Sequence, residues 1–594
     1  MGGSRKRTRK DRHENFTDKS RPRKRKQYFN PSTAETNKAS FSSSEKKVQQ
    51  CNEIIVPKNS TTGYRFINFI TVFTTLSTLV KCSKKGCNEK IKFEECQTRG
   101  IGFKIAVQCE KCNPQYIHSS PLLGHSYEIN RRFIYVMRLF GLGYAGCKKF
   151  CGLMDMGDFF GCHTSYDAVM ENIRSCANTV TEKYLLFAAD EEKKQQNSSD
   201  LHVSGDGTWK KRGFTSLYGV TSLIGLYTGK VLDLVVKSGY CKKCEYWESN
   251  LNSAEFQEWF ENHENECAAN HEGSSGKMEV DSIIEMFKRS VKKYKVRYLN
   301  YIGDSDSKTY SGIIKAAPYG DDVLIKKKEC VGHVQKRMGI RLRNLVNTVV
   351  EVTKTKGKVV KKKILSGKNK LTGKMIDKLA VYYELAIRRN CDSIEKMKNA
   401  IWATYYHYAS TDEDPQHEKC PSGEDSWCSW QQASATDSLA SYKHDYKALP
   451  SIVLETIKPI YEELSSDVLL ERCVGGFSQN SNESFNQLVW KITPKHLQAG
   501  FSVVEVAANI AACTFNDGTT AHLSILHSMG VNIGHSAHEY ARKEDESRIL
   551  HAERKSLESS KEGRTARRQE KKDCLDSTTV SEDAHYGPGI DDSM

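Results

Sequence analysis

Three acidic residues lie on sequence segments that we expect to form regular structure. Two of them come at the ends of expected strands, and the third lies in an expected helix nearer the C-terminus. Asp206 follows the β-rich run LHVSG, Asp304 follows the apolar run VRYLNYIG, and Glu483 lies in the helical run SNESFNQLVW, beside three asparagines. Carboxylates that converge bind Mg²⁺ or Mn²⁺, and a two-metal site activates an oxygen nucleophile and stabilises the leaving oxygen of a phosphodiester. These residue types predict metal-dependent phosphodiester chemistry.

Each of these carboxylates also has an ordinary structural interpretation. Asp206 with Gly207 fits a turn, although the glycine would also let a ligand or backbone approach closely, and Asp304 fits a helix N-cap. Asp306 competes with Asp304 for the second position, and strand-end placement favours Asp304. The acidic residues therefore have to be interpreted together with the elements that carry them.

The elements around these residues alternate in an order that is typical of a mixed sheet covered by helices. Three β-rich runs bounded by glycine come first, and the turn YTGK predicts that the second and third form a hairpin. The order continues as α-β-α-β-α, and a mostly helical stretch at 372–470 separates it from the helix that carries Glu483. This order predicts an α/β fold with an RNase H-like mixed sheet, in which the strands before Asp206 and Asp304 are neighbours.

The chain contains twenty cysteines, several of them closely spaced. Its N-terminus has no apolar stretch of the kind found in secretory signals, so paired cysteines indicate metal rather than disulfides. The best-spaced set predicts a zinc ribbon of two knuckles. The first knuckle has four residues between its cysteines, where two is commoner. The predicted ligands are Cys82, Cys87, Cys109 and Cys112.

Two further sets of cysteine and histidine have metal-like spacing. A Cys-x2-Cys pair followed by His-x3-Cys predicts a second structural zinc site, formed by Cys241, Cys244, His263 and Cys267. His271 is an alternative to His263. In the third set, isolated histidines and buried cysteines are at least as good an interpretation as a metal site. This set consists of His407, His417, Cys420 and Cys428.

The chain is basic and polar, with a formal net charge of +16 and a mean hydropathy of −0.59 over 594 residues. Residues 1–26 contain twelve Lys or Arg against three Asp or Glu, and the blocks RKRTRK and RPRKRK predict nuclear import, with a solvated basic tail as the alternative. No lipidation pattern and no apolar span of about 18 residues accompanies the charge, which favours nucleic acid over a membrane. Residues 66–80 fit one face of a buried helix.

Composition and pattern divide the chain into seven segments. Five basic residues in the third segment can contact DNA phosphates or form a solvated helix face, namely Arg131, Arg132, Arg138, Lys148 and Lys149. The first three segments are a disordered basic tail (1–60), a helix with the zinc-ribbon-like module (61–130) and a helical region (131–198). The first part of the catalytic core follows (199–350) and contains a Cys/His insertion at 240–275, and after it come a Lys-rich connector at 352–371 and the helical insertion (together 351–475). The last part of the core (476–537) and a disordered charged tail (538–594) complete the series.

Several runs in a fixed order resemble the Mutator-like transposases, specifically the animal branch of that superfamily. The resemblance covers roughly residues 61–520, and an ordered set of runs is more specific than any single acidic residue. The runs are SGDGTWKKRG, TSLYGV, GSSGKMEV, IGDSDSKTY, ECVGHVQKRMG, KNAIWATYYHYASTDEDPQHEKCPSGEDSWC and SQNSNESFNQLVW.

The resemblance implies an RNase H-like fold interrupted by a helical insertion and a DDE triad at Asp206, Asp304 and Glu483. It further implies metal-dependent cleavage at element ends and transfer of the freed 3′-hydroxyl into target DNA, by an enzyme that acts on two ends and is therefore expected to be a homo-oligomer. The family's Cys-x2-His motif matches Cys330 and His333, for which we expect a structural role near the active site. The alternative is a domesticated DNA-binding or regulatory protein that has lost catalysis.

Overall fold

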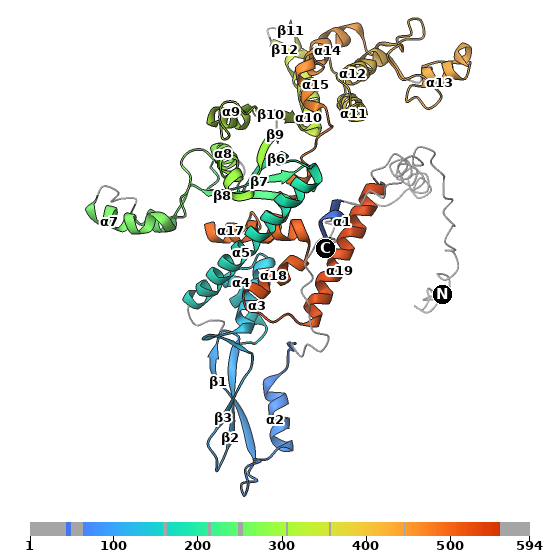
Figure 1. Cartoon of the computed structure of the whole chain (residues 1–594). Helices are drawn as coiled ribbons and strands as arrows, with labels where there is room; N and C mark the ends of the chain where they lie inside the picture. The colour runs from blue at the N-terminus through green and yellow to red at the C-terminus, as the bar shows by residue number, and fades with distance from the viewer. Residues whose placement is uncertain are drawn as a thin grey trace, which may run out of the picture.

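The computed structural model of the chain describes residues 43–48, 63–157, 163–211, 215–247, 253–303, 307–355, 358–444 and 446–558. Figure 1 shows a central sheet covered by helices, with a β-ribbon at one end and a group of helices at the other. The basic blocks of the first 26 residues lie outside the described residues. Among the residues that are described, no helix combines the length and apolar character needed to cross a membrane.

Five strands form the central sheet, in the order β10-β9-β6-β7-β8. Strand β6 (Asp200–Trp209) pairs antiparallel with β7 (Tyr218–Gly225), which pairs antiparallel with β8 (Val231–Ser238). On its other edge β6 pairs in parallel with β9 (Arg297–Gly303), and β9 pairs in parallel with β10 (Lys326–Glu329). The predicted mixed sheet, the hairpin and the adjacency of β6 and β9 are confirmed.

Helices cover both faces of this sheet. As a consequence, all eight residues of β7 are buried. Helix α8 (Ser275–Tyr294) packs on one face, and α5 (His163–Gln196) and α17 (Phe501–Asp517) pack on the other (Figure 1). Helix α9 (Ser307–Ala316) lies against α8. The largest hydrophobic core of the protein lies between these layers.

The helical insertion has a hydrophobic core of its own, which begins in α10 (Val331–Thr348). Its other elements are α11 (Gly373–Arg389), α12 (Ile394–Ala409), α13 (Ser429–Ala435), the 3-10 turn η4 (Leu439–Ser441), α14 (Ser451–Leu464) and α15 (Asp467–Cys473). The Lys-rich stretch predicted as a low-complexity connector instead contains an antiparallel hairpin of β11 (Val350–Thr355) and β12 (Lys358–Lys363). Valine and threonine between the lysines favour this extended backbone.

The N-terminal module is a three-stranded antiparallel sheet of β1 (Ile91–Arg99), β2 (Gly102–Cys109) and β3 (Gln115–His118). Helix α2 (Phe69–Leu79) packs beside it, with Phe73 against Phe93 at 5.2 Å between ring centroids. The helix predicted here therefore exists, but no residue of α2 is buried, because the small sheet covers only one side of it. The two-stranded pair β4 (Leu122–Leu123) and β5 (Ser126–Tyr127) leads into the helical region.

Two segments that the sequence predicted as disordered tails contain helices. Helix α1 (Ser43–Val48) packs on α17, where Lys47 lies over the Phe515 ring at 3.5 Å. Helix α19 (His535–Glu558) packs against α18 (Thr520–Ser528), and the buried Asp545 carboxylate accepts hydrogen bonds from the backbone at the start of α18. The prediction of a disordered tail is wrong for residues 538–558. Polar contacts of this kind hold α19 on the protein, and its lack of a strong apolar face explains why the sequence pattern did not indicate a packed helix. Residues 559–594 lie outside the described residues.

The predicted helical region consists of α3 (Glu128–Leu139), α4 (Tyr144–Leu153) and α5. Helix α3 lies against α18 through a partly buried hydrogen bond of 2.8 Å between the Tyr135 hydroxyl and Nδ1 of His522. Burial lowers the pKa of His522 from 6.5 to about 4, so the imidazole stays neutral in the folded protein.

We expect this histidine to make the protein less stable in mild acid. Between pH 6.5 and pH 4 the unfolded chain binds a proton at His522 that the folded chain does not, so the free energy of unfolding falls by about 1–3 kcal/mol as pH decreases through this window. Urea unfolding at pH 7 and pH 5 measures the effect. His522→Gln should lose less stability between these pH values than wild type, and an equal loss in both would contradict the assignment.

Candidate active site and metal-binding clusters

Helix α16 (Asn480–Ile492) lies along β6 and is held there by a row of polar side chains. The Gln479 amide donates to the carbonyl of Gly205 at 2.8 Å, and the Asn482 amide donates to the carbonyl of Ser204 at 3.2 Å. One and two turns further on, two more side chains of this face bond to β6, and both are described below. Positions three or four apart share one helix face, so this row fixes both the position and the rotation of α16.

Among the residues of β6 that contact this row of α16 side chains, Asp206 does so through its carboxylate. Nδ2 of Asn486 donates to Oδ2 of Asp206 at 2.7 Å, and Trp490 donates to the Thr208 hydroxyl at 2.8 Å on the same face. Asp206 lies within the strand, which continues to Trp209, and not at the strand end that the sequence predicted. The hydrogen bond from Asn486 sets the orientation of the carboxylate.

Glu483 lies in the first turn of α16, one turn before Asn486 and on the same side of the helix. Its side chain is 55% exposed, and its carboxylate lies 3.9 Å from the ammonium of Lys336 on α10. Because the Glu483 carboxylate is exposed and its ion pair with Lys336 is weak, it can exchange this partner for a divalent cation without a large desolvation cost. Helix α16 thus carries Glu483 to the region of Asp206.

The second aspartate of the predicted triad, Asp304, and its competitor Asp306 lie outside the described residues. Strand β9 ends at Gly303, directly before them, and Ile302 of β9 is paired with Ser204 of β6. The strand that leads to this aspartate is therefore the parallel neighbour of the strand that carries Asp206. The choice between the two aspartates stays a prediction.

The Cys-x2-His motif connects α10 to the same row of contacts. Cys330 is the buried N-cap residue of α10, and Nδ1 of His333 lies 2.9 Å from Oε1 of Gln479. Burial opposes ionisation of the Cys330 thiol, but hydrogen bonds from His333 and the backbone lower its pKa overall. Because Gln479 also bonds to Gly205, the contact of His333 links α10, α16 and β6. The role of the motif beside an active site stays a prediction.

Gly207 has a different purpose from the one that the sequence suggested. A Cβ atom at this position would lie 2.8 Å from Oε2 of Glu279 on α8, so the glycine makes room for this side chain. Sequence reasoning missed Glu279, since no local pattern connects a helix residue to a strand seventy positions away. It also missed Gln479 and Trp490, although their spacing with Asn482 and Asn486 follows the helical period.

If Asp206 binds a metal for phosphodiester cleavage, as the sequence predicts, we expect Asn486→Ala to slow strand cleavage by about 10–100-fold, because residues that orient a metal-binding carboxylate have effects of this size. The hydrogen bond to Asp206 disappears, while the other three contacts along α16 remain. Single-turnover cleavage rates at saturating Mg²⁺ measure the change, with Gln487→Ala on the exposed face as control. A rate equal to that of the control would contradict the positioning role.

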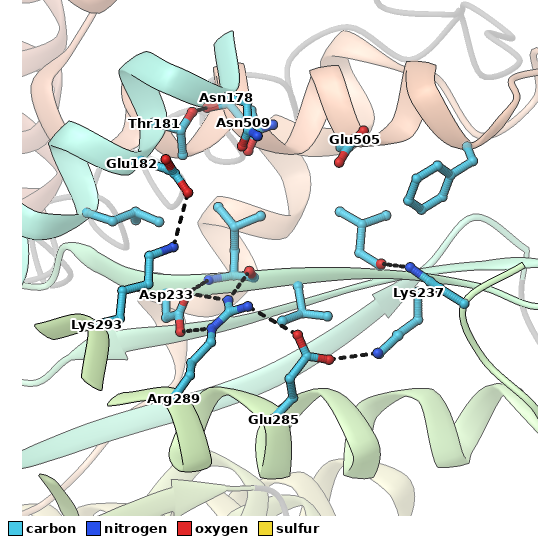
Figure 2. Close-up of a pocket in the computed structure, with 16 residues that line it drawn as sticks. Asn178, Thr181, Glu182, Asp233, Lys237, Glu285, Arg289, Lys293, Glu505 and Asn509 are labelled. Atoms are coloured by element: carbon cyan, nitrogen blue, oxygen red, sulfur yellow. Dashed lines mark hydrogen bonds and ion pairs between the residues drawn. The ribbon is translucent and has the colours of Figure 1, made fainter. Parts of the chain in front are cut away.

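The cavity in Figure 2 lies between β8, α5, α8 and α17 and contains none of the predicted triad. Its volume is about 230 Å³. The buried Asp233 accepts two hydrogen bonds from Arg289, at 2.8 and 2.6 Å, and one from the Tyr294 hydroxyl at 3.0 Å. Burial alone lowers the pKa of Arg289, but pairing with Asp233 raises it overall. The charges here pair with one another and fasten α8 to the sheet.

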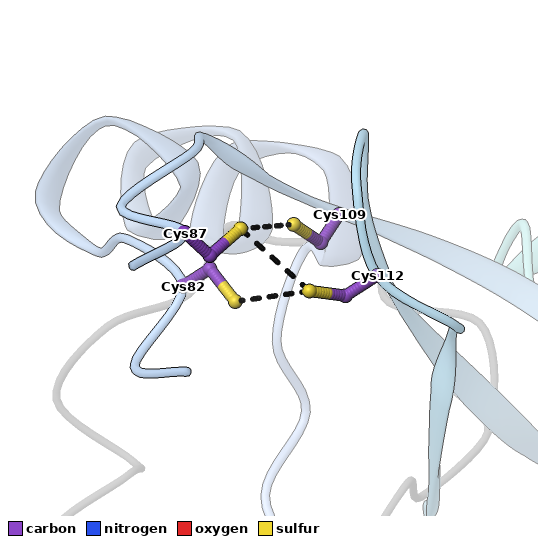
Figure 3. A group of neighbouring side chains, drawn as sticks. All are labelled: Cys82, Cys87, Cys109 and Cys112. Atoms are coloured by element: carbon purple, nitrogen blue, oxygen red, sulfur yellow. Dashed lines mark hydrogen bonds between the residues drawn. The ribbon is translucent and has the colours of Figure 1, made fainter. Parts of the chain in front are cut away.

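The four predicted ligands of the zinc ribbon lie together, as Figure 3 shows. Their sulfurs are 3.4 Å apart for Cys87 and Cys109, 3.6 Å for Cys87 and Cys112, and 3.9 Å for Cys82 and Cys112. Tetrahedral Zn–S bonds of about 2.3 Å place sulfurs roughly 3.8 Å apart. The pKa of the Cys109 thiol is lowered to about 7, and the largest cause is a hydrogen bond with the backbone of Lys111. This cluster can hold zinc.

The four predicted ligands of the second site also lie together, beside α6 (Lys242–Glu245), α7 (Ala254–His263) and the 3-10 turn η3 (Glu264–Glu266). Sγ of Cys241 lies 3.4 Å from Nε2 of His263, and the sulfurs of Cys244 and Cys267 are 3.4 Å apart. His271, the alternative ligand, lies instead in the segment before α8, with its Nδ1 atom 3.4 Å from the carboxylate of Asp281. This second cluster can also hold zinc.

The third set of cysteine and histidine is also brought together in the insertion, contrary to the interpretation as isolated residues.

Among the five basic residues considered for DNA, the three arginines have partners within the protein. Arg131 donates to the carbonyl of Met529 at 2.6 Å, Arg132 bonds to Glu128, and Arg138 is buried. Lys148 and Lys149 on α4 are exposed.

The chain matches the family model described as Mutator-like transposase over residues 63–428. The match covers more than half of the 594 residues, so the chain belongs to the Mutator-like transposase family. It includes Asp206 and all three Cys/His clusters, and it ends before α16. No curated protein and no solved structure matches the chain.

Proposed function

We propose that this protein is a DNA transposase with an RNase H-like core, whose active site consists of Asp206, Asp304 and Glu483 and binds Mg²⁺ or Mn²⁺. It cuts DNA at the ends of its element and joins the freed 3′-hydroxyl to target DNA. The observation that carries the proposal is the hydrogen bond from Asn486 to Asp206, since it fixes the helix of Glu483 against the strand of Asp206. Membership of the transposase family supports the same conclusion.

The donor set fits a hard divalent cation. Carboxylate oxygens are the protein ligands that Mg²⁺ prefers, together with substrate phosphate. The buried Oδ1 atom of Asn486 has no hydrogen-bond partner among the described residues, so an acceptor oxygen beside Asp206 is available to a ligand. When bound, the ions would activate the attacking oxygen and stabilise the leaving oxygen. Asn486 keeps the Asp206 carboxylate oriented, and the Gln479 and His333 contacts keep α16 in register.

The remaining predictions concern partners and location. The net charge of +16 and the exposed Lys148 and Lys149 favour contact with DNA phosphates, and the basic blocks in the first 26 residues favour nuclear import. The zinc clusters would be structural, because each supplies four protein ligands and leaves no open coordination position. Joining two element ends requires at least two copies of the chain in one complex.

The test is cleavage of a labelled duplex that carries the terminal repeats of the element. Wild type should cut it only with Mg²⁺ or Mn²⁺, and Asp206→Ala should bind the duplex equally well without cutting. Asp190→Ala, which removes an exposed carboxylate on α5, is the control and should cut normally. Equal cleavage by wild type and Asp206→Ala would refute the site, and specific binding without cleavage by wild type would identify a domesticated DNA-binding protein.

A further inference from the structure

Four metal-binding side chains meet inside the helical insertion, far along the chain from the predicted triad. His407 lies in the last turn of α12, His417 and Cys420 lie in the loop that follows, and Cys428 is the N-cap of α13. All four are buried, with exposed fractions of 7%, 1%, 5% and 0%. One ligand atom from each lies within 4.8 Å of all the others.

The distances between these atoms match the edges of a tetrahedral metal site. Nδ1 of His417 lies 3.4 Å from Sγ of Cys428 and 3.7 Å from Sγ of Cys420, which lies 4.0 Å from Nδ1 of His407. Bonds of about 2.0 Å to nitrogen and 2.3 Å to sulfur place neighbouring ligand atoms roughly 3.3–3.8 Å apart. Two thiolates and two imidazoles are a ligand set that zinc favours.

A chain of hydrogen bonds behind His417 presents its Nδ1 atom to the thiols. Nε2 of His417 lies 2.9 Å from Nε2 of His444, whose Nδ1 lies 2.5 Å from the carboxylate of Asp412. The Asp412 carboxylate accepts from the Nδ1–H of His444, so Nε2 of His444 is an acceptor to which the Nε2–H of His417 can donate. The Ser410 hydroxyl joins the same group of contacts, 2.9 Å from Nε2 of His417 and 3.2 Å from Nε2 of His444. Nδ1 of His417 is then an unprotonated acceptor that faces both cysteines. Metal-binding histidines usually donate their second ring N–H to an acceptor that fixes the tautomer and the orientation of the ring, and Nε2 of His444 is such an acceptor.

The segment around the cluster has little apolar material to hold it in place. Its own hydrophobic cluster consists of Ala403, Cys420 and Cys428, with Trp430 packed beside them. Between α12 and α14, the described residues form only the short α13 and η4. A loop of this kind needs a cross-link, and metal binding supplies folding free energy where a hydrophobic core does not.

We propose that His407, His417, Cys420 and Cys428 bind a third structural zinc ion, and that Asp412 and His444 position His417 for it. The ion fastens the 410–444 loop to α12 and so stabilises the outer part of the insertion. This inference is independent of the catalytic proposal, because a protein without strand cleavage would still need the cross-link.

Zinc content per folded chain provides the first test, by elemental analysis of the purified full chain. Cys428→Ser should contain one zinc ion fewer than wild type. Cys391→Ser, which removes a partly exposed cysteine of the insertion outside the cluster, is the matched control and should contain as much zinc as wild type. Equal zinc content in wild type and Cys428→Ser would overturn the site. If Cys428→Ser fails to fold, His407→Gln, which removes a different ligand, should contain one zinc ion fewer than wild type, and full zinc content in His407→Gln would overturn the site.

Zinc release to a chromogenic chelator tests the two positioning residues. His444→Ala keeps all four ligands, so it should still bind zinc but release one ion per chain about 10–100-fold more readily than wild type. His444→Gln offers an oxygen that accepts from His417 and should restore part of this difference, which a merely structural role for His444 would not predict. Release from His444→Ala at the wild-type rate for every ion would overturn the positioning role.

Discussion

Glu483→Gln is expected to reduce strand cleavage by about 10³-fold while leaving DNA binding and folding unchanged. A neutral amide is a far poorer ligand for Mg²⁺ than a carboxylate, and several kcal/mol of charge stabilisation in the transition state correspond to a factor of this size. The side chain is 55% exposed, so the exchange removes no buried contact. Single-turnover cleavage of terminal-repeat DNA at saturating Mg²⁺ measures the loss.

Two comparisons make this result specific. Glu471→Gln removes an exposed carboxylate from α15 and should cut at the wild-type rate. Lys336→Ala removes the cation beside Glu483 and should change the rate far less than Glu483→Gln, because an exposed ion pair contributes little. If Glu483→Gln cut as fast as Glu471→Gln, the third ligand would have to be another acidic residue, and Glu279 beside Gly207 would be the first to examine.

Cys109→Ser is expected to unfold the ribbon of β1, β2 and β3 and to remove one zinc ion per chain. The strands of this ribbon bury few apolar side chains, among them Ile105 and Ala106, so a hydrophobic core cannot hold it alone. Zinc contributes about 10–16 kcal/mol of apparent binding free energy in small zinc modules, and this free energy is folding free energy. Amide hydrogen exchange should show lost protection in the ribbon and unchanged protection in the central sheet.

The matched control is Cys96→Ser, because Cys96 lies in β1 of the same ribbon but outside the cluster. It should keep full zinc content and a protected ribbon. Removal of zinc from wild type by a strong chelator should reproduce the loss of protection seen in Cys109→Ser. Full zinc content in Cys109→Ser would eliminate the ribbon site.

The sequence predicted the central sheet well because its signals are local. The glycine-bounded runs, the YTGK turn and the helical period before and after them place β6 to β9 and α8 near their observed positions. Cysteine and histidine spacing predicted two of the clusters, since ligands three to five residues apart meet through local turns. The third cluster was underrated because His407 and His417 are ten residues apart, in separate elements.

Contacts between distant segments could not be predicted in the same way. Charge does not reveal which face of a helix is solvated, so Arg131 and Arg132 were considered for DNA although both bond to the loop after α18. A charged helix without a strong apolar stripe looks like a tail, and only contacts with distant segments, such as those of Asp545 with α18 and Arg548 with α17, explain why α19 packs on the protein. Glu279 was missed for the same reason, because its relation to Gly207 exists only after α8 packs on the sheet.

The placement of α16 has a consequence for how the enzyme matures during its synthesis. Asn486 and Asp206 are 280 positions apart, and the insertion between them has a separate core that begins in α10. A nascent chain therefore completes the central strands and the insertion before the ribosome releases α16. Contacts of such long sequence separation form slowly, which delays assembly of the carboxylates until the chain is nearly finished. Truncated products of translation would lack Glu483 and with it the third carboxylate that we propose for the active site.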